Sequence, residues 1–360
     1  MKIGARILKT GIAVALSLYI AHLLDLPSPS FAGIAAAFAI QPSIYRSFQS
    51  IIDQFQANII GAFFAILFTL LFTNNSIIIG FTVMIVIGIT IKLKIESTIP
   101  LAVVTVIAIM ETPGEQFIEF GLIRFGTVLL GVVSAFLVNL AFFPPKYEAK
   151  LYYQIVDTTE DIIKWIRINT RNASGHIELK EEIEKMKDRL VKLDQLFSFY
   201  KEERNRFERK GKQYAKTRKL VLFRQMLVTT TQAYDTLKRL HRLENEVHCM
   251  PQSFQDLIKT ELDTLSSSHE QLLLQFVGKI KSHVPVMDEK VSYQDSELLR
   301  EYIEQYKSEN EQQLQEATQL FPLVSMVLEY RSHLGHLEKL LDSFQTYHTD
   351  DNEVEVEGKD

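Results

Sequence analysis

Residues 31–61 read FAGIAAAFAIQPSIYRSFQSIIDQFQANIIG, and this stretch decides the fold. It opens with ten apolar or small residues, Phe31 to Ile40, which meet a polar break at Gln41 and Pro42. Proline removes a backbone donor and disturbs a helix, and backbone groups freed at membrane depth need protein or water around them. The stretch predicts a short, interrupted membrane helix beside a cavity. A plain lipid-facing anchor is the alternative.

Six apolar segments precede Lys150, at residues 7–24, 31–44, 52–72, 77–91, 98–110 and 122–143. The second and fifth are the shortest, below the roughly 20 residues of a straight span, and prolines bound both of them: Pro27, Pro29 and Pro42, then Pro100 and Pro113. Short, proline-interrupted segments at matching positions in two halves indicate a transport site. We therefore expect an all-α protein whose residues 1–147 form six transmembrane spans, arranged as two three-helix repeats.

Basic residues indicate the orientation of these spans. They occur before the first span and then in alternate loops, at Arg46, Lys92, Lys94, Lys146 and Lys150, whereas the loops between are neutral or acidic. The positive-inside rule then places both termini in the cytoplasm, with the loops around Asn74 and Glu111 outside. Since each repeat has three spans, the two repeats must be inverted relative to each other. We expect a multi-pass protein of the cell membrane.

After Pro144-Pro145 the hydrophobic period becomes 3.6, which predicts a cytoplasmic antiparallel helical bundle over residues 148–348. One stripe comprises Leu320, Val324, Val327, Leu334, Leu337, Leu341 and Phe344. This stripe offers a partner surface of coiled-coil type, and we expect a homo-oligomer, most simply a dimer. Residues 349–360 read as a disordered acidic tail.

Several classes of function find no support in the sequence. There is no P-loop, nucleophile elbow or catalytic triad, so we expect neither an enzyme nor a nucleotide-driven pump, and no cofactor. Glu329, His333 and His336 share a helical face, but chance spacing explains them better than a metal site does. The basic stretch Lys201–Lys219 favours a solvated hairpin, with contact to the anionic inner leaflet as the alternative and no nucleic acid partner. Cys249, the single cysteine, excludes an intramolecular disulfide and is expected to be buried.

A set of small and polar residues resembles a known family. The set comprises Gln41-Pro42-Ser43, Gly61, Arg124-Phe125-Gly126-Thr127, Gly131, Asn139 and Phe143-Pro144-Pro145. In these positions the first 147 residues resemble the aromatic acid exporter family of the fusaric acid resistance superfamily. The remainder is similar to the cytoplasmic C-terminal domain of its Gram-positive branch. The resemblance implies a plasma membrane protein and efflux of aromatic carboxylates. Asn58 stands where the family often has an arginine, so anion recognition would rest on Arg124.

Five residues are candidates for contact with a small organic anion. Arg124 is the strongest, because a charge inside a membrane segment is costly and tends to be retained for function or paired, and a guanidinium matches a carboxylate with two donors. Gln41 and Asn58 offer neutral hydrogen bonds, and Phe31 and Phe38 offer aromatic surface. The structural alternatives are a shallow Arg124 or its pairing with Glu119 or Glu96, and amides that only hold helices together.

Asp53 and Glu96 are candidates for proton coupling, because they lie near the cytoplasmic ends of the third and fifth segments. Simple hydration is the alternative. Two classes of function follow. The first is a secondary exporter of small aromatic or amphipathic organic anions. The second is a non-transporting membrane scaffold or sensor whose bundle is the working part. The proline breaks and the intramembrane arginine favour the first.

Overall fold

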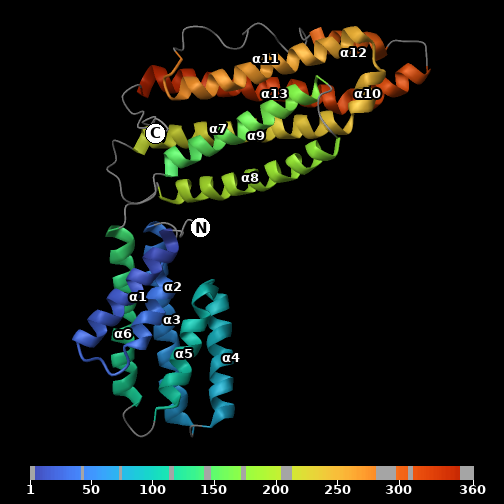
Figure 1. Cartoon of the computed structure of the whole chain (residues 1–360). Helices are drawn as coiled ribbons and strands as arrows, with labels where there is room; N and C mark the ends of the chain where they lie inside the picture. Colours follow the sequence, from blue (N-terminus) through green and yellow to red (C-terminus); the bar gives the residue numbers. More distant parts are fainter. Residues whose placement is uncertain are drawn as a thin grey trace. The chain divides into compact units, whose positions relative to one another are not determined.

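A computed structural model of the chain describes residues 5–41, 44–72, 75–112, 117–141, 147–171, 176–203, 213–280, 297–306 and 311–348. Over these ranges it contains α-helices, one 3₁₀ helix and turns, and no strand. The all-α prediction is therefore confirmed. The chain divides into two compact units, Met1–Pro145 and Lys146–Asp360 (Figure 1). Predictions for Pro42, Pro113, Pro144-Pro145 and the tail after residue 348 lie outside the described residues.

The first unit contains a helix for each apolar segment of the sequence. In chain order these are α1 (Ala5–Leu23), α2 (Ser30–Ala39), α3 (Ile44–Leu71), α4 (Ser76–Lys92), the 3₁₀ helix η1 (Glu96–Thr98), α5 (Ile99–Met110) and α6 (Phe117–Ala141). Over the described ranges, only α3 and α6 are both long and apolar enough to cross a membrane by themselves. The helix α2, with 10 residues, is about 15 Å long. The count of six spans stays a prediction.

Packing in this unit follows a regular pattern. The helices α3 and α6 lie side by side and run in opposite directions (Figure 1). Short α2 packs on long α6, and short α5 packs on long α3, while α1 covers α2 and α6 and α4 covers α5 and α3. Exchanging α1, α2 and α3 for α4, α5 and α6 leaves this set of close neighbours unchanged. This pattern agrees with two three-helix repeats, which stay a prediction.

Glycines set the closest helix contacts. The Cα of Gly131 lies against the carbonyl of Ala32, and that of Gly61 lies against the carbonyl of Ala102. These contacts bring α6 onto α2 and α3 onto α5, as expected where small residues let membrane helices approach. Gly126 on α6 differs, because nothing in the described part of the chain lies within 4 Å of a Cβ added there.

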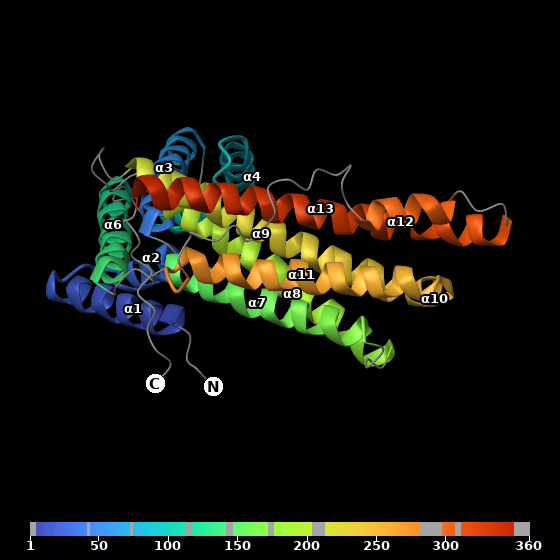
Figure 2. The ribbon, with the colours of Figure 1, turned by 90° about the horizontal axis from the view of Figure 1, so that it is seen from above.

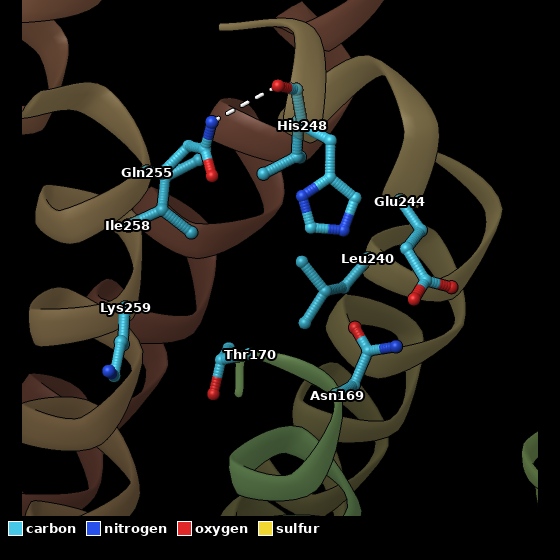
Figure 3. A pocket seen from close by; sticks show the side chains of 9 residues that line it. Asn169, Thr170, Leu240, Glu244, His248, Gln255, Ile258 and Lys259 are labelled. Carbon is cyan, nitrogen blue, oxygen red and sulfur yellow. Dashed lines mark hydrogen bonds between the residues drawn. The ribbon is translucent and has the colours of Figure 1, made fainter. Parts of the chain in front are cut away.

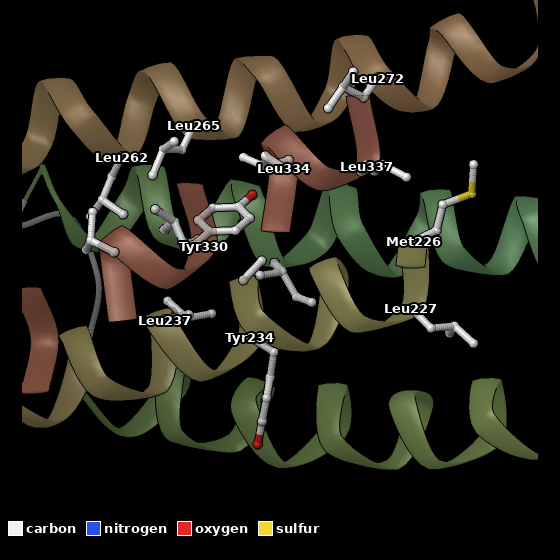
Figure 4. Close-up of a cluster of buried hydrophobic side chains, with 14 of the residues drawn as sticks. Met226, Leu227, Tyr234, Leu237, Leu262, Leu265, Leu272, Tyr330, Leu334 and Leu337 are labelled. Atoms are coloured by element: carbon white, nitrogen blue, oxygen red, sulfur yellow. The ribbon is translucent and has the colours of Figure 1, made fainter. Parts of the chain in front are cut away.

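The second unit is a bundle of long helices that lie side by side (Figure 2). Its helices are α7 (Tyr147–Asn169), α8 (His176–Glu203), α9 (Gln213–Arg242), α10 (Glu244–Cys249), α11 (Gln252–Phe276), α12 (Glu297–Tyr306) and α13 (Glu311–His348). Apolar side chains such as Leu262, Tyr330 and Leu337 meet in its core (Figure 4). This core explains the 3.6-residue period of the sequence.

Two expectations for the bundle need correction. The stripe from Leu320 to Phe344 is buried in the chain's own core, with 2% or less of each member exposed. It is therefore not available as a partner surface, and the expected homo-oligomer, which stays a prediction, needs another interface. Cys249 is exposed at the end of α10 rather than buried. It ends a six-residue helix outside the apolar core.

Candidate anion site

The candidate site is built around Arg124 on α6. This residue lies seven positions after Phe117, where α6 begins, so its Cα is about 10 Å along the helix axis. Its side chain is 2% exposed, and Nε, Nη1 and Nη2 have no hydrogen-bond partner among the described residues. A guanidinium carries donors only and keeps its charge. Burying those donors without an acceptor is unfavourable, so the site is incomplete as it stands.

Phe31, in the first turn of α2, covers this guanidinium. The Cζ atom of Arg124 lies 3.5 Å from the centroid of the Phe31 ring. The approach is possible because the next residue, Ala32, packs directly on Gly131 of α6. A ring face attracts a cation, by about 2 kcal/mol or more when the pair is desolvated. It does not accept the N–H bonds in the guanidinium plane, so those donors stay open to a carboxylate.

Neither structural alternative named for Arg124, a shallow position or pairing with Glu119 or Glu96, is seen in the described residues. Glu119 and Glu96 are both exposed, and neither forms an ion pair with the guanidinium. The guanidinium is also buried, so it does not extend to a solvated surface. What remains is a buried cation stacked on an aromatic ring.

The other predicted contact residues are not brought to Arg124. The Oδ1 atom of Asn58 accepts a hydrogen bond of 2.9 Å from Oγ1 of Thr105, which joins α3 to α5. Gln41 follows the end of α2, where its side-chain amide donates to the carbonyl of Phe38. Phe38 itself is 47% exposed. Of the five candidates, only Arg124 and Phe31 meet.

The two proton-coupling candidates are less buried than Arg124. Asp53 is half-buried on α3, and Glu96 is exposed as the first residue of η1. Neither forms an ion pair among the described residues. Their role in coupling stays a prediction, for which Asp53 has the more enclosed position.

Two polar residues were missed by sequence reasoning. Gln54 on α3 is 2% exposed, and its Oε1 has no hydrogen-bond partner in the described part of the chain. Asn139, noted only as part of a family pattern, accepts from Nζ of Lys9 at 3.0 Å and donates to Oγ of Ser47 at 2.7 Å. It also donates to the backbone oxygen of Gln41. Asn139 thereby connects α1, α3 and α6 with the end of α2.

The bundle holds a small cavity of about 50 Å³, lined by residues that include Thr170, His248 and Lys259 (Figure 3). One wall is fixed by a hydrogen bond from Nε2 of Gln255 to the backbone oxygen of His248. Drug-sized ligands occupy pockets of roughly 300 Å³ or more. This cavity has room for water but not for an aromatic acid.

In the described part of the chain, apolar helices pack around a buried guanidinium that has no hydrogen-bond partner, which is the arrangement expected of a helical membrane protein with an anion site. Comparison with known families gives the same class. The chain belongs to the fusaric acid resistance protein family, whose model matches residues 98–356. A second model, aromatic acid exporter family member 1, matches residues 1–142. The chain is thus a membrane protein of an exporter family, as its sequence predicted.

Similar proteins have names that state no substrate. UPF0421 protein YgaE of Bacillus subtilis is 54% identical over 357 residues, which cover 99% of this chain and 100% of the relative. UPF0421 protein OB2406 of Oceanobacillus iheyensis is 28% identical over 54% of this chain and 56% of its own length. UPF0421 protein SH1063 of Staphylococcus haemolyticus is 33% identical over 43% of this chain and 46% of its own length.

Proposed function

We propose that this protein is a secondary exporter of small aromatic or amphipathic organic anions in the cell membrane, with both termini cytoplasmic. The observation that carries the proposal is the guanidinium of Arg124, which lies against the ring of Phe31 and has no hydrogen-bond partner within the described ranges. The family supports export in general, and the site supports the anion in particular.

The chemistry of the pair fits an aromatic carboxylate. The carboxylate would accept two parallel N–H bonds from the guanidinium, which satisfies donors that the protein leaves open. An aromatic ring on the substrate would pack against Phe31 or take its place over the cation. Binding also neutralises a buried charge, so the occupied site is easier to hold inside a membrane than the empty one.

Release requires that this neutralised pair be separated. Water that reaches Arg124 would hydrate both partners and weaken their attraction, because the Coulomb energy falls as the local dielectric constant rises. The short helices α1 and α2 cover the site on α6. Movement of this hairpin is the simplest way to admit water. Asp53 is the proposed proton carrier for coupling, with Glu96 as the second candidate.

Transport by Arg124 variants tests the proposal. Wild-type protein in liposomes should exchange radiolabelled benzoate and 4-hydroxybenzoate. Arg124→Gln should lower the rate at least tenfold at equal insertion, because it loses a charge-assisted pair of roughly 1.5–3 kcal/mol. Arg124→Lys should recover only part of it, because an ammonium does not present two parallel donors. Arg46→Gln, which removes an arginine outside the site, is the matched control.

The exchange rate of each variant is divided by the amount of folded, inserted protein. Undiminished exchange by a well-folded Arg124→Gln protein would remove Arg124 from the substrate path. If the wild type moves none of the probes while it binds a partner through its bundle, the scaffold or sensor function is the better explanation.

A further inference from the structure

Three features of the first unit recur at a spacing of about 70 residues. The rings of Phe55 on α3 and Phe125 on α6 are 70 positions apart and touch edge to face, with centroids 5.3 Å apart. A residue in contact with its own counterpart marks the axis that relates two repeats. An axis through this pair exchanges α3 with α6, the two long helices.

The second feature is the close glycine contact. Gly61 meets the carbonyl of Ala102, and Gly131 meets that of Ala32, so both the glycines and the alanines differ by 70 positions. The third is the corner between the first two helices of each half. Asp25 and Lys94 there have positive φ values of 47° and 61°, which is uncommon for residues other than glycine.

The two corners also have the same pattern of backbone hydrogen bonds. The backbone N–H groups of Leu24 and Leu26 donate to Ile20 and Ala21, and those of Leu93 and Ile95 donate to Ile89 and Thr90. Each hydrogen bond in the second corner joins residues 69 positions after those of its counterpart in the first corner. Packing, close contact and corner geometry therefore agree on one relation between the two halves.

Under the same relation, the counterpart of Arg124 is Gln54, 70 positions earlier in the chain. Arg124 and Gly131 are seven residues apart, on the face of α6 that packs on α2. Gln54 and Gly61 are also seven residues apart, on the face of α3 that packs on α5 through Asn58. Residues at i, i+4 and i+7 share a helix face. Gln54 thus has the same place in the α3–α5 seam that Arg124 has in the α2–α6 seam.

Both residues are also incomplete in the same way. Each is 2% exposed, and each has polar atoms without a partner among the described residues. The Gln54 amide is held at one end only, by a 3.1 Å hydrogen bond from Nε2 to Oγ of Ser50. A buried amide with one open end is costly, which argues for a partner that is not always present.

We infer that Gln54 is a second contact for the transported anion, at the position of the other half that corresponds to Arg124. This inference rests on the proposed function. The open atom is Oε1, an acceptor, so it can pair with a hydroxyl donor of the substrate, such as the phenol of 4-hydroxybenzoate, but not with the carboxylate. Because Gln54 carries no charge, the anion is held strongly in one half and weakly in the other. A carrier needs such weak contacts if the substrate is to leave.

Gln54→Met tests this, because methionine keeps the length of the side chain and removes the amide. Binding is measured on the purified full chain by the thermal shift that benzoate and 4-hydroxybenzoate produce, and transport by exchange in liposomes. We expect the affinity for 4-hydroxybenzoate to fall roughly two- to tenfold, as for one neutral hydrogen bond, and the affinity for benzoate, which lacks the hydroxyl, to stay the same. Without probe, the melting temperature should be unchanged or higher, because an unpaired buried group is removed. Gln56→Met, at an exposed position of the same helix, is the control.

The second part of the test moves the positive charge from α6 to α3. Arg124→Gln alone should lose binding at least tenfold, whereas Gln54→Arg combined with Arg124→Gln should restore it in part by moving the cation to the other seam. A Gln54→Met protein with wild-type affinity for 4-hydroxybenzoate and wild-type exchange of it, or with a lower melting temperature, overturns the inference. A double variant no better than Arg124→Gln overturns it as well. If the wild type binds neither probe, the proposed function falls, and the inference falls with it.

Discussion

Gly131 shows how one residue can set the geometry of the anion site. A Cβ atom at this position would lie 2.2 Å from the backbone oxygen of Ala32. The backbone of Ala32 cannot change rotamer as a flexible side chain can, so α2 would have to shift away from α6. Since Phe31 precedes Ala32, such a shift would also move the ring off the Arg124 guanidinium.

We therefore expect Gly131→Ala to destabilise the protein by roughly 1–3 kcal/mol, as overpacked sites do. Gly126→Ala is a matched control on the same helix, because nothing lies within 4 Å of its added methyl group. That variant should be neutral or more stable by about 0.5–1 kcal/mol, since alanine is the better helix former. Melting temperatures in one detergent compare the two. Equal effects at both positions would contradict the close contact.

Sequence reasoning found Arg124 and Phe31 for separate physical reasons, and the structure joined them. The cost of an intramembrane charge identified Arg124, and the aromatic surface that a substrate ring would need identified Phe31. Their contact depends on how closely α2 approaches α6, which no local pattern contains. Gln54 was missed because it lies inside the third apolar segment, where a single glutamine does not change the hydropathy pattern. The 70-residue spacing of Phe55 and Phe125 is the signal that could have found it.

At the scale of helices, the apolar segments predicted all six helices of the first unit, but not where each begins. α3 starts at Ile44, eight residues before the third apolar segment. Ser47 interrupts the hydropathy there, and Gln54 does so inside the third segment itself, yet both are buried. A hydropathy pattern counts such residues as exposed, because it has no knowledge of the partner that buries them. The stripe from Leu320 to Phe344 was misassigned for the same reason.

The pair of α11 and α13 carries a pH-dependent contact in the bundle. His269 on α11 is fully buried, and its Nδ1 shares a 2.9 Å hydrogen bond with the hydroxyl of Tyr330 on α13. Burial lowers the pKa of His269 from 6.5 to about 3. Between these values the unfolded chain binds a proton that the folded chain does not. The contribution to stability is therefore complete above pH 6.5 and is lost as the pH falls toward 3.

From pH 7 to pH 5 this linkage should lower the free energy of unfolding of the bundle by about 2 kcal/mol. Trp165, the single tryptophan, packs against the same core and reports its unfolding by fluorescence. His269→Gln should flatten the pH dependence over this range, whereas His248→Gln, at an exposed position, should not. An unchanged slope in His269→Gln would show that other groups cause the acid sensitivity.

At the scale of the whole molecule, the orientation in the membrane is the prediction on which the transport path depends. Opposite directions of α3 and α6 require that they cross in opposite senses (Figure 1). The basic residues of alternate loops then place the beginning of α4 outside and the bundle inside. Asn75 is exposed immediately before α4, and Cys249 is exposed in the bundle. These two positions can therefore be labelled to report both sides of the membrane.

Asn75→Cys in a Cys249→Ser background should react with a membrane-impermeant maleimide on intact cells. Wild-type Cys249 should react only after permeabilisation, because charged juxtamembrane residues such as Lys92 and Lys94 favour the cytoplasmic side. The Asn75 side chain accepts a hydrogen bond from the N–H of Ile77, so its loss costs the helix about 1 kcal/mol and should not prevent insertion. The reverse labelling pattern would invert the topology and place the Arg124 end of α6 toward the cytoplasm. In that case the same site would face the compartment from which an exporter loads its substrate.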